Sequence, residues 1–382
     1  WEQRKISELA EKTYGGGTPT TSNEAFWNGN IPWIQSSDIV DGKLMGVEPR
    51  KYITQTGLNS SATQLVPKDS IAIITRVGVG KLAYMPFSYS TSQDFLSLSK
   101  LNTEPFFTVY ACYKKLQSEL NTVQGTSIKG ITKDELLAKT ISVPVYSEQK
   151  QIGSFFTQLD TLITLHQRKY EKLVNIKKSM LDKMFPKNGA SVPEIRFKGF
   201  TDPWEQRKLD EIANFSKGVG YSKNDLCEEG TPIILYGRLY TKYETSIFDV
   251  DTFVKEKAGS VYSKGGEVIV PASGETAEDI SIASVVVKPG ILLGGDLNIV
   301  SPTTEYDSAF LALTISSGAT HKYLSSLAQG KSVVHLHNAD IQSVSAKFPT
   351  KREQEKIHLL FGKIDTLITL HQRKLEKLQN IK

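Results

Sequence analysis

The sequence has 382 residues, of which 39% are hydrophobic and 23% are charged, so it can bury ordinary cores and is neither disordered nor fibrous. No apolar run approaches the length of a membrane span, which predicts a soluble protein. Lys and Arg (46) outnumber Asp and Glu (41), and the net charge of +5 allows a nucleic-acid partner without indicating one.

Residues 1–145 have the pattern of a mixed α/β domain. The glycines at 15–17 follow no convincing strand, so they are expected to lie in a loop. Helices are predicted from Pro105 to about Leu120 and after the capping-box pattern Thr132–Glu135. Strands are predicted at 70–75, 81–85, 95–99 and 141–145.

A heptad pattern runs through residues 148–185. Apolar residues alternate there at steps of four and three, from Ile152 and Phe156 onward, and no proline interrupts them. Pro186 ends the pattern. A single helix of roughly 55 Å, at about 1.5 Å per residue, is therefore predicted.

The second half of the sequence repeats the first. Asp160–Lys169 returns without change as Asp365–Lys374, and the first five residues return from Trp204 onward. Residues 6–123 and 209–328 share little by contrast. Two explanations stay open: the divergent parts recognise two different targets, or a duplicated chain has drifted everywhere except where its helix packs.

The predicted elements of the second half follow the same order. Strands are expected at 267–270, 281–287, 291–293 and 344–348, a helix is expected at 320–328, and Asn338 should cap a further short helix. The predicted divisions of the chain are a first domain at 1–145, a long helix at 146–187, a linker at 188–203, a second domain at 204–347 and a second long helix at 348–382.

A long helix with one apolar stripe needs a partner in water, and the second copy supplies one. We expect the two helices to pack as an antiparallel coiled coil, with a globular domain at each end and a pseudo-two-fold axis between the halves. His166 and His371 occupy the same position in the two heptad patterns. A histidine satisfied at a helix interface is a better interpretation than a pH switch or a metal pair.

Sequence patterns for catalysis are missing. Gly80-Lys81 and Gly330-Lys331 lack the first glycine of a phosphate-binding loop, and no Pro-Pro is present for the base-holding loop of an amino-methyltransferase. No Gly-x-Ser-x-Gly turn occurs, and the two cysteines lie far apart without a metal-ligand pattern. We therefore expect a non-catalytic binding protein without a metal or a disulfide, in keeping with a reducing cytoplasm, and we find no export signal.

Three kinds of segment carry a resemblance to a known family. They are Gln124–Leu136 with its repeat from Gln329, Glu148–Asp160 with its repeat from Glu353, and the linker Val192–Trp204. Over essentially all 382 residues, the chain resembles the specificity subunits of type I restriction-modification systems. It departs from them at the two ends, where the family's opening segment is missing and the second copy is shorter than the first.

The resemblance implies two α/β target recognition domains and no catalysis by the chain itself. Each domain would bind one half of a split, asymmetric site on double-stranded DNA, and the paired helices would set the gap between the halves. The helices would also dock two methyltransferase (modification) subunits, which methylate adenine N6 with S-adenosylmethionine. Two restriction (motor-nuclease) subunits would complete an ATP-dependent enzyme, so S-adenosylmethionine, ATP and Mg are expected on the partners, and no membrane partner is expected.

Contacts to bases and phosphates require Arg, Lys, Asn, Gln, Ser and Tyr on exposed loops. The segment Arg76–Lys81 is the best single candidate because two glycines allow close backbone approach between two cations, although a plain hairpin turn explains it equally well. Glu275 could accept from a cytosine amino group or be a solvated carboxylate. The expected DNA-binding residues are Gln35, Ser36, Ser37, Arg76, Lys81, Gln93, Thr126, Ser127, Lys129, Tyr236, Arg238, Tyr240, Lys242, Ser273, Glu275, Lys331, Ser332 and His335.

Two other hypotheses remain. The chain could be the DNA-recognition fragment of a fused methyltransferase-nuclease, or a duplicated coiled-coil scaffold without a DNA role. A complex built on such a scaffold would bind DNA with no sequence preference and little salt dependence. Under the specificity-subunit hypothesis, we expect the chain to bind DNA weakly without its partners.

Overall fold

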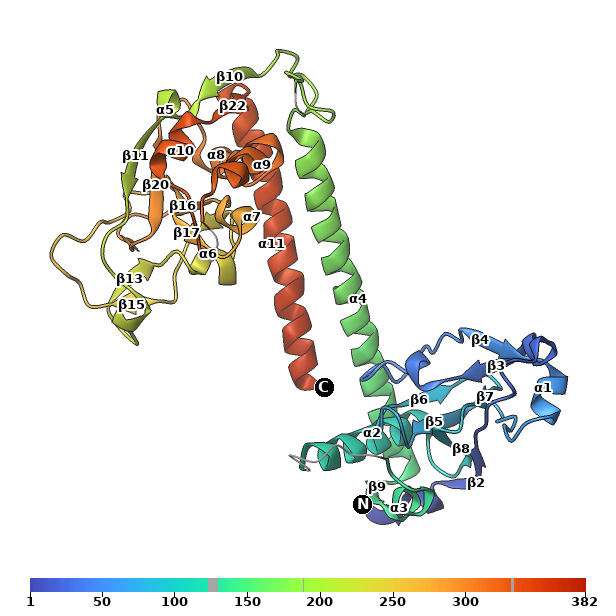
Figure 1. Cartoon of the computed structure of the whole chain (residues 1–382). Helices are drawn as coiled ribbons and strands as arrows, with labels where there is room; N and C mark the ends of the chain where they lie inside the picture. Colours follow the sequence, from blue (N-terminus) through green and yellow to red (C-terminus); the bar gives the residue numbers. More distant parts are fainter. Residues whose placement is uncertain (123–129, 188, 331–332) are drawn as a thin grey trace. The chain divides into compact units, whose positions relative to one another are not determined.

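The computed structural model describes residues 1–122, 130–187, 189–330 and 333–382 (Figure 1). The chain divides into two compact units, one formed by residues 1–164 with 378–382 and the other by residues 165–377. The division falls inside the long helix α4 (Tyr146–Met184), because Ile152 and Phe156 in its first turns pack on the core of the first unit. The domain limits drawn from the repeat stay a prediction.

An antiparallel four-stranded sheet forms the centre of the first unit. Ile71 and Ile73 of its middle strand belong to one core cluster, whereas Ala72 and Ile74 belong to another. Alternate side chains of this strand are therefore buried on opposite faces of the sheet. The strand order is β2 (Ala10–Gly15), β8 (Phe95–Leu101), β5 (Ser70–Ile74) and β6 (Leu82–Met85).

Two layers cover this sheet. On one face lies α2 (Pro105–Thr122), whose Phe107 and Leu116 share a core cluster with Ile71 and Ile73 of β5. Against the other face packs Ile34 of a smaller sheet, which runs in the order β4 (Lys51–Ile53), β3 (Trp27–Ile34) and β7 (Ser90–Thr91). Sequence patterns miss β3 because Gly29 and Pro32 interrupt it.

Short elements complete the first unit. β1 (Glu2–Lys5) pairs antiparallel with β9 (Thr140–Val143). Thr132 caps α3 (Lys133–Ala138) as predicted, because its Oγ1 accepts from Glu135 N (3.2 Å). The strands and helices predicted in this unit are confirmed to within two residues. The other elements are η1 (Ile6–Glu8), η2 (Glu24–Phe26), η3 (Ser36–Asp38) and α1 (Gln55–Asn59).

The second unit repeats this arrangement of strands. Its larger sheet runs in the order β11 (Ala213–Lys217), β20 (Leu297–Pro302), β16 (Glu267–Pro271), β18 (Ser284–Val286) and β14 (Ser246–Ile247). Its smaller sheet runs in the order β12 (Leu226–Cys227), β15 (Phe253–Val254), β13 (Thr231–Ile234) and β19 (Leu292–Leu293). The antiparallel set β11-β20-β16 matches β2-β8-β5, and the parallel pair β13-β19 matches β3-β7.

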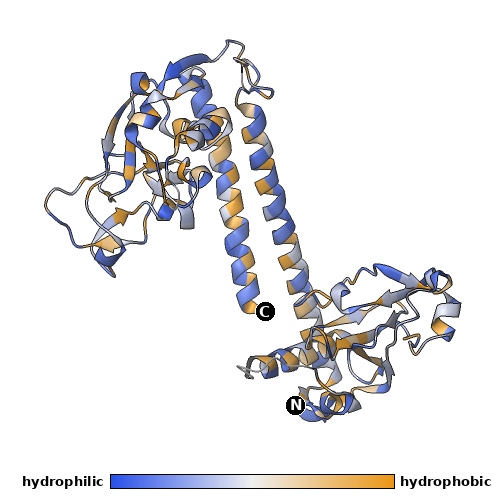
Figure 2. Ribbon diagram, viewed as in Figure 1, coloured by the Kyte–Doolittle hydropathy of each residue, from blue (hydrophilic) through white to orange (hydrophobic). Residues whose placement is uncertain are grey.

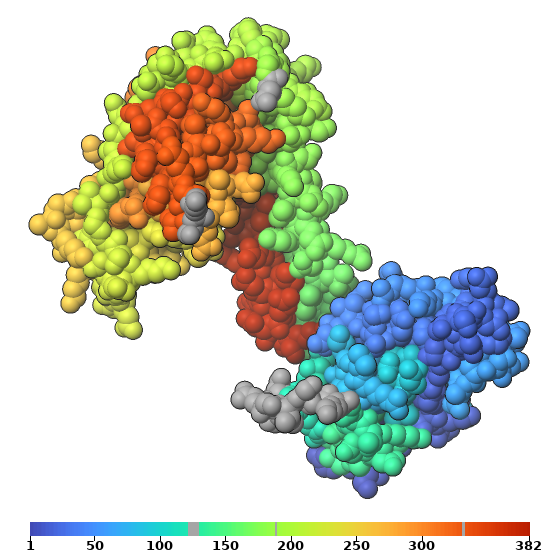
Figure 3. Space-filling model, viewed as in Figure 1, coloured from blue at the N-terminus to red at the C-terminus, as the bar shows by residue number. Residues whose placement is uncertain are grey.

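Helices pack on the second unit's sheets. On the face seen in Figure 3, segments from residues 205–260 lie beside segments from residues 300–330 and 333–345. α8 (Ser308–Ile315) escapes the sequence patterns because it is apolar and buried on nearly all sides, so it has no periodicity. The other elements are α5 (Leu209–Ile212), η4 (Lys223–Asp225), α6 (Arg238–Thr241), α7 (Ala277–Ile280), α9 (Gly318–Leu327), α10 (Asn338–Ser343), β17 (Ser273–Gly274) paired with β21 (Val334–His335), and β10 (Glu205–Lys208) paired with β22 (Ser345–Phe348).

Two predictions in this unit are wrong in detail. His337, not Asn338, is the N-cap of α10, and the Asn338 side chain instead donates to Ser216 O (2.8 Å). The strand predicted at 281–287 covers only 284–286, because the Ser281 hydroxyl is bonded to side chains of α9 just after α7 ends.

Within the second unit, the C-terminal half of α4 lies antiparallel to α11 (Lys351–Ile381). His166 Nδ1 lies 2.8 Å from His371 Nδ1, and Lys177 Nζ lies 2.5 Å from Asp365 Oδ1, so residue numbers rise on one helix as they fall on the other. Both helices alternate apolar and polar residues (Figure 2). This is the antiparallel pairing that the repeat predicts, and each histidine has a partner at the helix interface.

The segment predicted as a linker is anchored on α11. Arg196 donates from Nε and Nη2 to the two carboxylate oxygens of Glu353, at 2.8 Å each, and the Glu353 side chain is almost fully buried. Such a two-bond contact fixes orientation as well as distance. Among the described residues, every helix is too short or too polar to cross a membrane.

Acidification is expected to destabilise the helix pair. Burial, followed by the charges of His371, Lys374 and Lys169, lowers the pKa of His166 below its ordinary 6.5. The folded state then holds fewer protons than the unfolded state just below pH 6.5, so stability is lost as the pH falls through that range. Thermal melting at about pH 7.5 and pH 5.5 should show a larger drop in Tm for the parent than for His166→Gln. Equal drops would contradict this role of the histidine pair.

Candidate nucleic-acid interface

Loops far apart in the sequence meet at one end of the first unit's sheets. Ile34 O, at the end of β3, accepts from Ser92 N (2.9 Å). Thr75, which follows β5, donates from N to Asp94 O (2.7 Å) and accepts at O from Ile131 N (2.8 Å). We call these three backbone bonds the loop junction. They join four separate segments: those after β3 and β5, the one between β7 and β8, and the one before α3.

The second unit builds the same junction. Ile234 O accepts from Gly294 N (2.9 Å), Ala272 N donates to Asp296 O (2.8 Å), and Leu336 N donates to Ala272 O (3.1 Å). Equivalent positions in the two units are therefore Ile34 and Ile234, Ser92 and Gly294, Thr75 and Ala272, Asp94 and Asp296, and Ile131 and Leu336.

Different side chains stand beside these equivalent positions. Arg76 follows Thr75 in the first unit, whereas Ser273 follows Ala272 in the second. In the same way Ser36 corresponds to Tyr236, and Gln93 corresponds to Gly295. Because backbone groups form the junction, the neighbouring side chains can differ without disturbing it. The two units thus present unlike chemistry on a common frame.

The junction brings together several of the residues predicted to bind DNA in the first unit. Gln93 is exposed and accepts from the Thr18 hydroxyl (2.6 Å). Gln35 and Ser36 are half-buried, and Ser37 is exposed. These residues follow strand ends that the junction holds side by side. Their predicted contact with DNA stays a prediction.

Arg76 and Lys81 flank the tight turn after β5. Gly78 (φ +92°) and Gly80 (φ +88°) have the left-handed backbone that favours glycine, and Val79 N donates to Arg76 O (3.2 Å). Arg76 is exposed and Lys81 is half-buried, and neither side chain pairs with a residue that the structure describes. A hairpin turn and a DNA-contacting loop are both compatible with this geometry.

The glycines at 15–17 follow a strand after all, since β2 ends at Gly15. Gly16 and Gly17 lie in a loop as predicted, for reasons of packing, whereas Gly15 is the last residue of the strand. A Cβ on Gly16 would lie 1.8 Å from Ser92 O, and one on Gly17 would lie 2.5 Å from Thr63 N. Only glycine allows the loop to approach the junction this closely.

In the second unit, Tyr236 and Lys242 are exposed near the junction. Tyr240 is half-buried and donates to Ser273 O (2.7 Å), and burial, followed by the charge of Asp279, raises its pKa well above the ordinary value. Lys242 Nζ lies 2.9 Å from Asp251 Oδ2, which lowers the pKa of that carboxyl.

Arg238 is placed differently from what its predicted role requires. Its side chain is only 7% exposed, and it is paired with Asp251 and Glu244 (2.8 Å each). It also donates to Asp249 O (3.1 Å). A guanidinium held in this way has little left to offer a base edge, so Arg238 is better explained as an internal anchor than as a direct DNA contact.

Ser273, Glu275 and His335 lie together where β17 pairs with β21. Ser273 Oγ and His335 Nδ1 are 3.2 Å apart, and the His335 and His337 rings are parallel with centroids 6.3 Å apart. Glu275 and His335 are exposed, whereas Ser273 is buried. The predicted residues Thr126, Ser127, Lys129, Lys331 and Ser332 lie outside the described residues.

Sequence reasoning missed two basic residues beside the first unit's junction. Arg50 donates from Nη2 to Ser37 O (2.5 Å), and Lys51 Nζ lies 5.8 Å from the ring centroids of both Trp27 and Trp33. The adjacent Arg50-Lys51 pair was the available signal. It could not be weighed because β3 and β4, which place it, were not recognised.

The loop junction and the paired helices define a class of protein with two related but unlike binding domains on a duplicated frame. The family described as the type I restriction modification DNA specificity domain matches this chain twice, over residues 1–175 and 201–380. The chain therefore belongs to that family, and it is a type I restriction-modification DNA specificity subunit.

Individual relatives agree with this assignment. The MjaIX and MjaVIII specificity subunits of Methanocaldococcus jannaschii are 22% and 24% identical, and each alignment covers 100% of this chain and 90% of the relative. The crystal structure of the type I restriction-modification S subunit from M. genitalium matches with a TM-score of 0.64 at 15% identity. That match covers 100% of this chain and 93% of the other, and it shows the common fold.

Removal of the Arg76 side chain is expected to weaken binding to the target DNA. A well-placed arginine contact is worth about 1–3 kcal/mol, so Arg76→Ala in the assembled complex should lose about tenfold in affinity. Competition binding at fixed salt measures this. Lys100→Ala is the matched control, since Lys100 is an exposed cation 3.7 Å from Glu11 and away from the junction. Equal losses in both variants would assign Arg76 only a general electrostatic effect.

Proposed function

We propose that this chain recognises a bipartite, asymmetric DNA site and directs adenine-N6 methylation and ATP-dependent restriction by its partner subunits. The observation that carries this proposal is the pair of loop junctions, which have the same backbone bonds and different side chains. One frame can serve two unlike half-sites only if the side chains that reach the bases differ. This favours two different targets over simple drift of the duplication.

The chemistry of the junctions suits direct readout of bases. Arg76, Gln35 and Gln93 in the first unit can donate to or accept from base edges, and Tyr236, Glu275 and His335 offer a different set in the second. Lys81 and Lys242 are suited to phosphates. We assign no catalytic role to the chain. S-adenosylmethionine, ATP and Mg would be bound by the partners, and the complex would act in the cytoplasm, where the DNA lies.

The outward leucines of the repeated decapeptide support two copies of one partner. Leu162 and Leu165 on α4, and Leu367 and Leu370 on α11, are each 44% exposed. Packing between the helices does not require identical side chains on their outer faces. We infer that each helix offers the same apolar face to one methyltransferase subunit, and that two restriction subunits join through the complex so formed.

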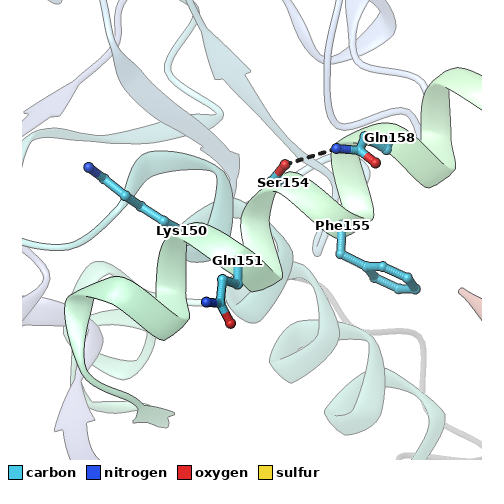
Figure 4. A pocket seen from close by; sticks show the side chains of 5 residues that line it. All are labelled: Lys150, Gln151, Ser154, Phe155 and Gln158. Carbon is cyan, nitrogen blue, oxygen red and sulfur yellow. Dashed lines mark hydrogen bonds between the residues drawn. The ribbon is translucent and has the colours of Figure 1, made fainter.

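The apolar face continues along α4 within the first unit. Phe155 is 54% exposed and lies seven residues, or two turns, before Leu162, on the same side of the helix. It lines a shallow pocket with Lys150, Gln151, Ser154 and Gln158, in which Gln158 donates to Ser154 Oγ (3.1 Å; Figure 4).

The relatives do not favour the alternative of a fragment of a fused methyltransferase-nuclease.

Exchange of one domain should change one half of the target. Cells that carry this gene with its methyltransferase partner should contain N6-methyladenine at a split motif. Replacement of residues 6–123 by the equivalent part of another specificity subunit should alter one half of that motif and leave the other half and the gap unchanged. Long-read sequencing of genomic DNA measures both. If both halves stayed the same, the first unit would not be a reader of sequence.

Charges on the outward leucines should remove partner subunits one at a time. Leu162→Asp with Leu165→Asp should reduce the number of bound methyltransferase subunits from two to one, and the same changes at Leu367 and Leu370 should remove the other. Native mass spectrometry counts the subunits. Thr161→Asp with Thr164→Asp is the matched control, because it adds the same two charges on a different side of α4. Two bound subunits in every variant would place the docking surface elsewhere.

A further inference from the structure

A buried carboxylate organises the first unit's loop after β3. The Asp38 side chain is fully buried and accepts from Gln35 N through Oδ2 (3.0 Å) and from Arg50 Nε through Oδ1 (2.6 Å). Arg50, which is 59% exposed, also donates to Ser37 O (2.5 Å). The ion pair therefore holds both ends of the segment Gln35–Ser37, which contains three of the predicted DNA contacts.

A buried cation organises the second unit's loop after β13. The Arg238 side chain is 7% exposed, and its partner Asp251 is 64% exposed, with Nη1 2.8 Å from Oδ1. Further bonds to Glu244 Oε2 and Asp249 O make Arg238 the centre of this loop. It ties the start of α6, next to Tyr236, to the segment that leads into β15.

These two ion pairs occupy equivalent positions with their charges exchanged. Asp38 and Arg238 each lie four residues after the junction residues Ile34 and Ile234. On the partner strands, Pro32 is opposite Tyr52 and Pro232 is opposite Phe253. Counting back two residues from Tyr52 and Phe253 gives Arg50 and Asp251. In both units the residue four positions after the junction isoleucine is the buried member of the pair.

The exchange of charge has a physical consequence. Removal of the exposed member leaves the buried charge without its partner, which is unfavourable, whereas a pair of reversed polarity again places opposite charges together. A change of one member alone is thus penalised, although the pair as a whole can be inverted. Both units have an ion pair at this position. This indicates that the loop must be connected to the segment before the partner strand, whichever of the two charges is buried.

We propose that Asp38–Arg50 and Arg238–Asp251 are positioning ion pairs that hold the DNA-reading segments Gln35–Ser37 and Tyr236–Tyr240 in their binding conformation. The proposal rests on the proposed DNA-reading function and deepens it. Asp38 and Arg238 act through the residues beside them and do not touch bases. Binding sites built on loops need this kind of support, because an unsupported loop must be ordered each time that it binds.

The test compares single and double charge changes in the assembled complex. Asp38→Arg places two cations together and should weaken binding to the cognate site by about tenfold or more. It should abolish discrimination at the first half-site only. Asp38→Arg with Arg50→Asp copies the second unit's polarity and should recover part of the lost affinity, because opposite charges meet again although Gln35 N and Ser37 O lose their side-chain partners. Competition binding with DNAs altered in one half-site at a time measures both quantities.

Retained discrimination at the second half-site is the internal control for folding, because that reader is unchanged. Should Asp38→Arg prevent assembly, Arg50→Gln replaces it, since it puts no cation in the buried position and leaves Asp38 its bond from Gln35 N. The proposal is overturned if the single variants discriminate at the first half-site like the parent, or if the double variant is no better than the singles. Failure of the parent itself to discriminate would instead contradict the proposed DNA-reading function.

Discussion

One peptide unit at the end of each central strand organises the candidate interface. Thr75 uses its N–H to hold Asp94 and its carbonyl to hold Ile131, and Ala272 does the same with Asp296 and Leu336. Buried backbone groups are nearly always paired, so a change of the neighbouring side chains need not disturb these bonds. The bonds of the junction are made by main-chain groups. This is why the side chains around it can differ so widely between two copies that share one fold.

The repeated decapeptide begins with an aspartate for a reason that the structure supplies. In the first unit, Asp160 accepts from Tyr110 OH (2.6 Å), and burial followed by this hydrogen bond raises the pKa of Tyr110 well above its ordinary value. In the second unit, Asp365 accepts from Thr245 Oγ1 (3.0 Å). The carboxylates also pair, at 2.5 Å each, with Lys382 and Lys177, respectively. In each unit, one carboxylate on a long helix thus bonds both to a residue of the globular part and to a lysine of the other repeat's helical segment.

The sequence predicts those parts of the fold whose pattern is local. The heptads, the capping box at Thr132 and the buried strand at Ser70 are confirmed because each depends on neighbouring residues. Strand β3 and helix α8 depend on distant contacts and were not predictable. The same limit applies to the site. Residue chemistry selected Gln93 and Arg76 correctly as loop residues. It could not show that the Arg238 side chain is buried and paired with carboxylates that lie up to 13 residues away in the sequence.

The exchanged ion pairs determine which piece of this protein can be exchanged between specificities. A graft of Gln35–Asp38 into the second unit would put a carboxylate at position 238, opposite Asp251 and Glu244, with no cation inside to compensate. The reverse graft would place a buried guanidinium against Arg50. Single loops are therefore incompatible between the two units, although the frames are alike. A segment that carries both members of its ion pair, as a whole domain does, can be exchanged without a buried charge being left unpaired.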